Sequence, residues 1–356
     1  MLVLGRRVDS APLVLIGLLT VLPAVWLALA GLVSLAALLP RPEPRRLGLA
    51  ALWWAAFGWT WGLPALPGGE PVVAPIRVLS WNVQRLLFED DDQGAALACV
   101  ADGVRRAAPD VLVLLEVSAR DVERLADRLG LDCAQADYTG TGDPRHGGLA
   151  VCVDSRRWGL ARRSARRFTE DRAWYYLFAE IEERPPAEAP RPRVDAGLSA
   201  ADEDGWGAPP ARATGQRVFN VLAAHLHPYR LDPPDEVGDL SDPRADAVTD
   251  AQGAEAAALL RRVQRLDDPT LVAGDFNSAR DTALHLGLRR VLRDVHDVAG
   301  GRPRPTVKAL GRLPVKVDYI YATPDIAVSA AAVGDEACAD HRPVSAVVGL
   351  PAPRVR

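Results

Sequence analysis

Polar side chains recur where short apolar runs of the sequence end. They are Asn82, Glu116, His225, Asp275, Asn277, Asp318, Asp340 and His341. Strand ends that meet at one edge of a sheet are where α/β proteins commonly build their sites. The pattern therefore predicts that these residues, which are far apart in the chain, come together in the fold.

The chemistry of this set is that of oxygen and imidazole ligands without thiolates. Hard oxygen ligands suit Mg²⁺ or Mn²⁺ rather than zinc. A divalent cation neutralises phosphate charge, and a carboxylate-paired histidine can orient or deprotonate a water molecule. The set therefore predicts attack of water on a phosphate ester.

Purely structural roles could account for these residues one by one. Those roles are a turn cap, a helix cap, an Asx turn, an ion pair between Asp318 and Lys316, and a satisfied buried histidine. Six such coincidences in one chain favour a shared site over unrelated roles.

The elements that must position these residues lie between residues 76 and 350. Apolar patterning predicts strands at residues 76–81, 111–115, 148–153, 175–181, 217–224, 270–273, 317–321 and 344–348. Helices are predicted at residues 94–108, 119–129 and 246–266. So many consecutive strands indicate a mixed α/β domain rather than a simple doubly wound sheet.

Two segments interrupt this pattern. Residues 184–216 are rich in Pro, Ala, Arg and acidic residues, and we predict a disordered or loosely packed insertion there. Residues 231–242 are rich in Pro and Asp and predict a surface loop.

Composition and charge narrow the class of protein. The chain has 356 residues, of which 49% are hydrophobic and 25% charged, so a packed core is expected and wholesale disorder is excluded. The whole chain has a net charge of −4; residues 1–75 carry +2, so the part after residue 75 carries −6, which argues against tight sequence-independent binding of nucleic acid. The four cysteines form no Cys-x-x-Cys pair, which argues against structural zinc. Cys152 is predicted to be a core residue, and no disulfide pairing can be read from the spacing.

Two long uncharged runs precede the domain, at residues 11–39 and 47–69. Since a bilayer requires about 20 apolar residues per helix, we predict an N-terminal membrane region at residues 1–70, with helices at about 11–39 and 47–66. A linker follows at residues 71–75. A cleaved signal peptide is the alternative, but the apolar run continues past the candidate cleavage site. The three arginines of the intervening turn favour a multi-pass protein of the cell membrane whose large domain is extracytoplasmic.

Six motifs, taken in chain order, resemble those of the endonuclease/exonuclease/phosphatase superfamily. They are Leu-Ser-Trp-Asn-Val at 79–83, Leu-Leu-Glu at 114–116, Ala-His-Leu at 224–226, Gly-Asp-Phe-Asn at 274–277, Val-Asp-Tyr-Ile at 317–320 and Asp-His-Arg-Pro at 340–343. The superfamily includes pancreatic-type deoxyribonuclease, abasic-site endonucleases, neutral sphingomyelinases and inositol-polyphosphate 5-phosphatases. The resemblance covers residues 76–350 and implies a four-layer α/β sandwich, with two mixed sheets face to face and helices outside.

The resemblance also implies a metal site and a nucleophile site. Glu116 is implied to be the principal Mg²⁺ ligand, with Asn82 beside it, and Asp340 to bind metal or support the site. Asp275 and Asn277 are implied to position the attacking water and the phosphate. Mn²⁺ is a possible substitute for Mg²⁺.

Two histidines complete the implied site. His341 is the implied catalytic histidine, and we expect Asp318 to orient it through a hydrogen bond of roughly 2.6–3.2 Å. His225 is implied to contact phosphate or assist the leaving group, with His227 as the alternative if the register differs. Gln84 departs from the pattern, since many members carry a second Asn there.

The leading hypothesis is a membrane-anchored Mg²⁺-dependent phosphoesterase. Its predicted partners are the lipid bilayer and a phosphate-ester substrate, namely a phospholipid head group, a small phosphodiester or nucleic acid; no protein partner is predicted. An extracellular endonuclease is the alternative, and the pairs Arg162-Arg163 and Arg166-Arg167 could supply part of a basic groove. A non-catalytic binding domain is a further alternative, which the complete set of candidate ligands disfavours. The missing Trp-Cys-Asp-Arg run at residues 317–319 argues against inositol 5-phosphatases.

Overall fold

The computed structural model of the chain describes residues 31–34, 44–45, 47–48, 50–52, 54, 68–84, 93–137, 147–168, 175–184, 193–195, 198, 215–228, 243–280, 282–300, 304–309, 313–335 and 338–352. The predicted membrane helices fall largely outside these ranges, as do the predicted loop at 231–242 and most of the insertion at 184–216. Among the helices that the structure describes, none combines the length and the apolar character needed to cross a membrane.

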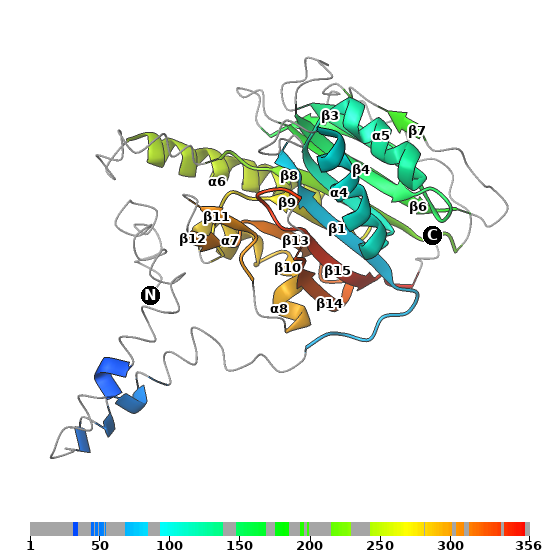
Figure 1. The fold of residues 1–356 in the computed structure, drawn as a ribbon. Helices are drawn as coiled ribbons and strands as arrows, with labels where there is room; N and C mark the ends of the chain where they lie inside the picture. The colour runs from blue at the N-terminus through cyan, green and yellow to red at the C-terminus, as the bar shows by residue number, and fades with distance from the viewer. Residues whose placement is uncertain are drawn as a thin grey trace.

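Two mixed β-sheets form the domain (Figure 1). The first contains, in spatial order, β14 (Ala327–Val333), β15 (Val344–Gly349), β1 (Ile76–Asn82), β2 (Val111–Val117), β4 (Gly148–Asp154), β3 (Leu131–Asp137) and β7 (Arg193–Asp195). The second contains β10 (Arg293–Asp294), β13 (Asp318–Ala322), β9 (Thr270–Asp275), β8 (Val218–His225), β6 (Tyr175–Glu183) and β5 (Trp158–Arg167). A separate hairpin pairs β11 (Val307–Ala309) with β12 (Leu313–Val315).

Alternating side chains of each strand supply two different apolar layers. Val111, Val113 and Leu115 of β2 point between the two sheets, whereas Leu112 and Leu114 point to the outer face of the first sheet. The second sheet divides its side chains between the centre and its own outer face in the same way. Three apolar layers separate four layers of structure, so the predicted sandwich is confirmed.

Helices cover the outer faces of both sheets (Figure 1). On the first sheet lie α4 (Gln93–Ala107) and α5 (Ala119–Leu129), and on the second lie α6 (Pro243–Gln264) and α7 (Ala283–Leu288). The short α8 (Val295–Ala299) packs beside β14. The bounds of α5 follow from its caps. Ser118 accepts a hydrogen bond from Asp121 N at its start, and Gly130 takes a left-handed conformation at its end.

Strand β5 is not predicted by the sequence pattern, because arginines occupy its middle and its end. Arg162 forms an ion pair with Glu180 of the neighbouring β6, and Arg163 with Asp195 of β7. One charge pair within the sheet and one between the two sheets thus accompany arginines where an apolar pattern would be expected.

The described part of the predicted insertion includes an ordered strand. β7 runs parallel to β3 and extends the edge of the first sheet. Leu198 packs against the central apolar layer, and its N–H donates to Gln135 O at 3.2 Å. A strand of three residues leaves no periodic signal, which is why composition alone predicts no order here.

Cys152 is a buried core residue, as predicted, and all four cysteines are disulfide-bonded. Cys133 and Cys152 face each other across β3 and β4, with Cα atoms 4.0 Å apart. Cys99 of α4 is bonded to Cys338, which lies 239 residues later, between β14 and β15. Sheet register and helix packing create these pairs, so the spacing of the cysteines carries no signal for them.

Candidate active site

The topology of the sheets brings the candidate residues to one end of the sandwich. β1 and β2 are parallel neighbours in the first sheet, and β8 and β9 are parallel neighbours in the second. Asn82, Glu116, His225 and Asp275 lie at or near the carboxyl ends of these four strands. β13 runs antiparallel to β9 and begins with Asp318, directly opposite Asp275. The loop before β15 reaches the same end, because β15 runs antiparallel to β1.

The Asp275 carboxylate is the centre of the site. Its Oδ2 atom accepts a hydrogen bond from Asn82 Nδ2 at 3.2 Å, and it lies 3.7 Å from His225 Nε2 and 3.8 Å from His341 Nε2. Asn82 Nδ2 also donates to Glu116 Oε1 at 3.0 Å. One amide group therefore joins a carboxylate of the first sheet to a carboxylate of the second.

Glu116 enters the site through an irregularity in β2. The register of β2 against β4 shifts between Leu115 and Val117, and Glu116 adopts a φ of +55°. Bulges of this kind re-aim a side chain next to active sites. The Glu116 carboxylate also lies near Asp340, whose pKa is raised by partial burial, against the effect of His341, and by the charge of Glu116.

Asp318 and His341 form the predicted pair. His341 Nδ1 lies 2.8 Å from Asp318 Oδ2, within the predicted range. Burial alone would lower the pKa of His341, but the carboxylates of Asp318 and Asp275 override it and raise that pKa to about 10. His341 is therefore protonated at neutral pH, and Nδ1–H donates to Asp318. Burial and the Asp318 charge raise the pKa of Asp275, which makes its carboxylate a stronger base than usual.

His225, and not His227, is the histidine of its segment that enters the site. The His225 side chain is buried beside Asp275, whereas the His227 side chain is 41% exposed and lies 3.9 Å from Glu255. Of the two histidines, His225 is therefore the one that we carry forward as the candidate site residue.

The Asx turn that a purely structural role predicts for the Gly-Asp-Phe-Asn motif is also present. Asp275 Oδ1 accepts a hydrogen bond from Asn277 N at 2.8 Å, which closes an Asx turn, and Asn277 Nδ2 donates to Leu226 O at 2.9 Å. Asp275 thus uses one oxygen for the turn and the other for the site. Gly274 is required here, because a Cβ atom at this position would lie 1.8 Å from Ala224 O.

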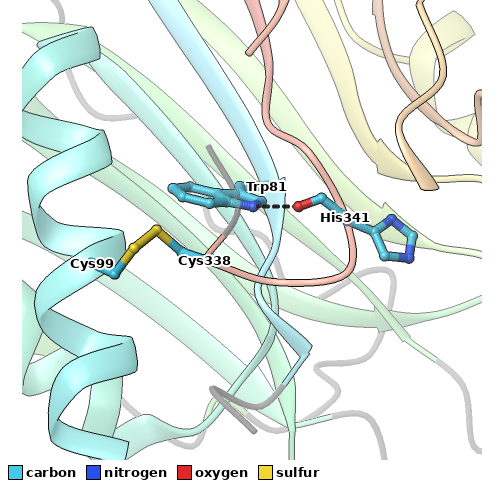
Figure 2. The surroundings of a disulfide bond; sticks show 4 residues. All are labelled: Trp81, Cys99, Cys338 and His341. Atoms are coloured by element: carbon cyan, nitrogen blue, oxygen red, sulfur yellow. Dashed lines mark hydrogen bonds between the residues drawn. A yellow bond between two sulfur atoms is a disulfide. The ribbon is translucent and has the colours of Figure 1, made fainter. Parts of the chain in front are cut away.

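The loop that carries His341 is held by contacts that sequence analysis misses. The Trp81 indole donates to the His341 carbonyl at 3.0 Å (Figure 2). Figure 2 also shows Cys338, three residues before His341, bonded to Cys99 of α4. The sequence marks Trp81 as part of a motif but gives no sign of what its indole contacts.

Thr306 is a further residue that the sequence does not mark. Its carbonyl accepts a hydrogen bond from Arg342 N at 2.7 Å, and its Oγ1 accepts from Val317 N at 3.0 Å and Asp318 N at 3.2 Å. Thr306 thereby joins the start of β13 to the loop before β15. It stands alone in a Pro- and Arg-rich stretch, so no pattern could have identified it.

A purely structural role for Asp318 would require an ion pair with Lys316, but Lys316 does not make this ion pair. Its Nζ lies 3.4 Å from the centroid of the Tyr319 ring and has no hydrogen-bond partner among the described residues. Burial lowers the pKa of Lys316 to about 8, against the effect of neighbouring carboxylates.

A possible divalent metal site is present among the described residues. Asp275, Asp318 and His341 offer ligand atoms that all lie within 4.8 Å of one another. Asp318 Oδ1 is buried without a hydrogen-bond partner in the described part of the chain, so a carboxylate oxygen remains for a cation. The predicted ligand Glu116 is not in this group but adjoins it through the Asn82 amide.

The arginines of β5 that could have formed a basic groove have partners or are buried within the domain. Arg162 pairs with Glu180 of the neighbouring β6, and Arg163 pairs with Asp195 of β7 in the other sheet. Arg166 is buried, and Arg167 donates to the Tyr175 hydroxyl at 3.1 Å. These side chains are therefore not arranged as a free cationic surface for a polyanion.

The comparison with protein families gives one match. The model described as "Endonuclease/Exonuclease/phosphatase family" matches residues 79–341, which include all eight candidate residues. No curated protein sequence matches the chain.

Solved structures share the fold at low sequence identity. A functionally unknown conserved protein from Enterococcus faecalis V583 is 17% identical with a TM-score of 0.55, covering 77% of this chain and 99% of that chain. An endonuclease/exonuclease/phosphatase from Bacteroides vulgatus is 15% identical with a TM-score of 0.56, covering 78% of this chain and 100% of that chain. D. rerio TDP2 complexed with single strand DNA product is 13% identical with a TM-score of 0.55, covering 78% and 100%.

Proposed function

The chain belongs to the endonuclease/exonuclease/phosphatase family and is a metal-dependent phosphoesterase, and from this premise we propose that it uses Mg²⁺ to hydrolyse a lipid or small-molecule phosphate ester. The observation that carries the proposal is the hydrogen bond between Asp318 and His341 beside the Asp275 carboxylate. A carboxylate with a raised pKa next to a protonated histidine supplies both the proton acceptor and the hydrogen-bond donor that this hydrolysis requires.

The proposed division of labour follows from these proton affinities. Asp275, with its raised pKa, accepts the proton of the attacking water at Oδ2. His341 keeps its proton and donates a hydrogen bond from Nε2 to a phosphoryl oxygen as negative charge develops there. Asp318 orients the imidazolium ring, and His225 contacts the phosphate or the leaving group from the other side of Asp275.

The oxygen donors of the site fit a hard divalent cation. Mg²⁺, when bound, neutralises phosphate charge and polarises the phosphoryl oxygens, and Mn²⁺ can replace it. Glu116, with Asn82 and Asp340 beside it, is the proposed holder of the ion. Asp275 and Asp318 offer further oxygen donors next to this group, whereas we assign His341 to the phosphate.

The charge of the protein supports a small or lipid-linked substrate over a nucleic acid. The part after residue 75 is acidic, and the arginine pairs of β5 are already engaged. A nuclease remains the competing outcome, because the similar D. rerio TDP2 structure holds a single strand DNA product.

Membrane anchoring and an extracytoplasmic domain are part of the same proposal. The uncharged runs at 11–39 and 47–69 support the anchor, and two disulfides support an oxidising compartment. Fusions after residue 350 test the orientation. We expect the alkaline phosphatase fusion to be active and the green fluorescent protein fusion to be non-fluorescent. The reverse pattern would place the domain in the cytoplasm.

A substrate panel tests the activity itself. The full chain in detergent, with Mg²⁺, is given sphingomyelin, phosphoinositides, bis-p-nitrophenyl phosphate, RNA and plasmid DNA. We expect hydrolysis of a lipid or small phosphodiester and little cleavage of nucleic acid. Preferential cleavage of plasmid or RNA would replace the substrate class with the nuclease alternative.

The matched variant for this panel is Glu116→Gln, which keeps the size of the side chain and removes its charge. It should abolish Mg²⁺-dependent turnover while the circular dichroism spectrum stays unchanged. Wild-type turnover with unaltered Mg²⁺ dependence in this variant would show that the ion is held elsewhere.

A further inference from the structure

We propose that the Cys99–Cys338 disulfide is the positioning device of the catalytic loop, defined here as residues 338–343, and that turnover requires this bond but not Cys133–Cys152. The inference rests on the proposed function of His341. It makes Cys99 and Cys338 positioning residues, since neither contacts the reacting groups.

The catalytic loop has few regular contacts of its own. It lies between β14 and β15, outside the β-ladder, and its backbone is tied by the bonds from Trp81 to His341 O and from Arg342 N to Thr306 O. The disulfide is the covalent tie, and it attaches the start of the loop to α4 (Figure 2).

The covalent tie is close enough to His341 to fix its position. Three residues span at most about 11 Å of chain, so the backbone at His341 cannot move far from a fixed Cys338. The α4 end of the tie is itself rigid, because Leu97 and Val100 on either side of Cys99 pack into the outer apolar layer of the first sheet. The imidazole of His341 must stay 2.8 Å from Asp318, and misplacing a catalytic group by about 1 Å can cost 10²-fold in rate.

The two disulfides differ in their access to solvent. Cys99 is exposed on α4 although Cys338 is only 1% exposed, whereas Cys133 and Cys152 are each 1% exposed. A dithiol such as dithiothreitol can therefore attack the Cys99 sulfur. Its thiolate displaces Cys338 as a thiolate, and its second thiol then closes the dithiol into a cyclic disulfide. The protein gains two thiols and the dithiol loses two electrons and two protons.

The Cys133–Cys152 bond provides a matched control within the same molecule. It joins neighbouring strands β3 and β4, which the sheet already holds in register, and neither strand carries a candidate catalytic residue. Removing it measures the general cost of losing a disulfide, whereas removing Cys99–Cys338 measures the effect on the position of the catalytic loop.

The experiment measures kcat and KM of three full-length proteins in detergent. They are the wild type, the Cys99→Ser/Cys338→Ser variant and the Cys133→Ala/Cys152→Ala variant. With bis-p-nitrophenyl phosphate and Mg²⁺, at a temperature where all three are folded, the Cys99→Ser/Cys338→Ser variant should lose about 10- to 100-fold in kcat with little change in KM. The Cys133→Ala/Cys152→Ala variant should keep kcat within about twofold. Brief dithiothreitol treatment should reproduce the first loss, mass spectrometry should find Cys99 and Cys338 alkylated, and reoxidation should restore kcat.

Amide hydrogen exchange gives a readout that does not depend on activity. Exchange at Arg342 N–H, which Thr306 O now protects, should accelerate when the Cys99–Cys338 bond is absent and stay slow when Cys133–Cys152 is absent. Wild-type kcat in the Cys99→Ser/Cys338→Ser variant, equal losses in both variants, or unchanged exchange at Arg342 would each overturn the inference. An oxidised wild type that hydrolyses no phosphate ester would instead refute the proposed function, and the exchange measurement would still decide the positioning role.

Discussion

Asp275 and His341 face each other across the site, but the chain holds them in different ways. Asp275 ends a central strand that pairs with β8 on one side and β13 on the other. His341 lies in a loop and is held by a disulfide three residues away and by the Trp81 indole. The ladder positions the carboxylate through backbone hydrogen bonds, whereas side chains from other elements position the imidazolium.

This difference predicts how each half of the site responds to mutation. A change in the ladder should alter stability and activity together, because the same hydrogen bonds support both. A change in the ties of the loop should alter activity with a smaller effect on stability, since few core contacts depend on the loop.

The largest effect on activity is expected where the two halves meet. Asp318→Asn and His341→Gln should each lower kcat by about 10²–10⁴-fold, because each removes the oriented, charged hydrogen-bond donor to the phosphoryl oxygen. The double variant should lose no more than the more severe single variant, since both act on one catalytic step. Steady-state kinetics of the four proteins would measure this, and losses that multiply in the double variant would mean that the two residues act independently.

The ladder itself is tested by Gly274→Ala. The new Cβ atom would meet Ala224 O at 1.8 Å in a backbone with φ of +149°, so the paired strands must separate. We expect a loss of about 3 kcal/mol in the free energy of unfolding, together with a loss of turnover. Denaturant titration measures it. Gly253→Ala in α6 is the control, because nothing lies within 4 Å of its Cβ position and it should be neutral or stabilising.

The charge of His341 predicts a pH effect on stability. Its pKa in the folded protein is raised to about 10 from 6.5, so the stabilisation it gives is complete below pH 6.5 and is lost as the pH rises through about 10. Lys316, whose pKa burial lowers to about 8, contributes in the opposite sense. The difference in unfolding free energy between wild type and His341→Gln should therefore shrink on raising the pH from 7 to 10, by something of the order of 1 kcal/mol per pH unit. Urea titrations in metal-free buffer with a chelator measure this, and a constant difference would refute the assigned charge.

The smallest effect is expected from Trp81→Phe. This variant keeps the ring in the outer apolar layer and removes the hydrogen bond to His341 O, worth about 0.5–1.5 kcal/mol. kcat should fall by up to about tenfold with a nearly unchanged melting temperature. Trp158→Phe is the control, because the Trp158 indole N–H is buried without a hydrogen-bond partner among the described residues. Equal kcat in wild type and Trp81→Phe would show that the indole hydrogen bond is not needed to hold the loop.

The strands that carry the carboxylates could be predicted because local patterns encode them. Apolar runs place Asn82, Glu116 and Asp275 at strand ends, and the order of the motifs leads to the contact between Asp318 and His341. For the residues at strand ends, the residue proposed to act in the site belongs to the strand that positions it, so a short window of sequence contains both.

The remaining features depend on contacts between distant segments, which no local pattern records. The bulge that turns Glu116 into the site depends on its pairing with β4, and β5 depends on acidic partners on two other strands. Thr306 acts through hydrogen bonds to two segments that follow it in the chain. These contacts appear only when the sheets are assembled.

The long sequence separations within the site also bear on biosynthesis. Asn82 and Asp275 are 193 residues apart, Trp81 and His341 are 260 apart, and Cys99 must wait for a partner 239 residues further on. A ribosome that has translated β1 through β14 has not yet made His341 or Cys338. The proposed site can therefore be completed, and the Cys99–Cys338 bond can form, only after nearly the whole chain has been synthesised.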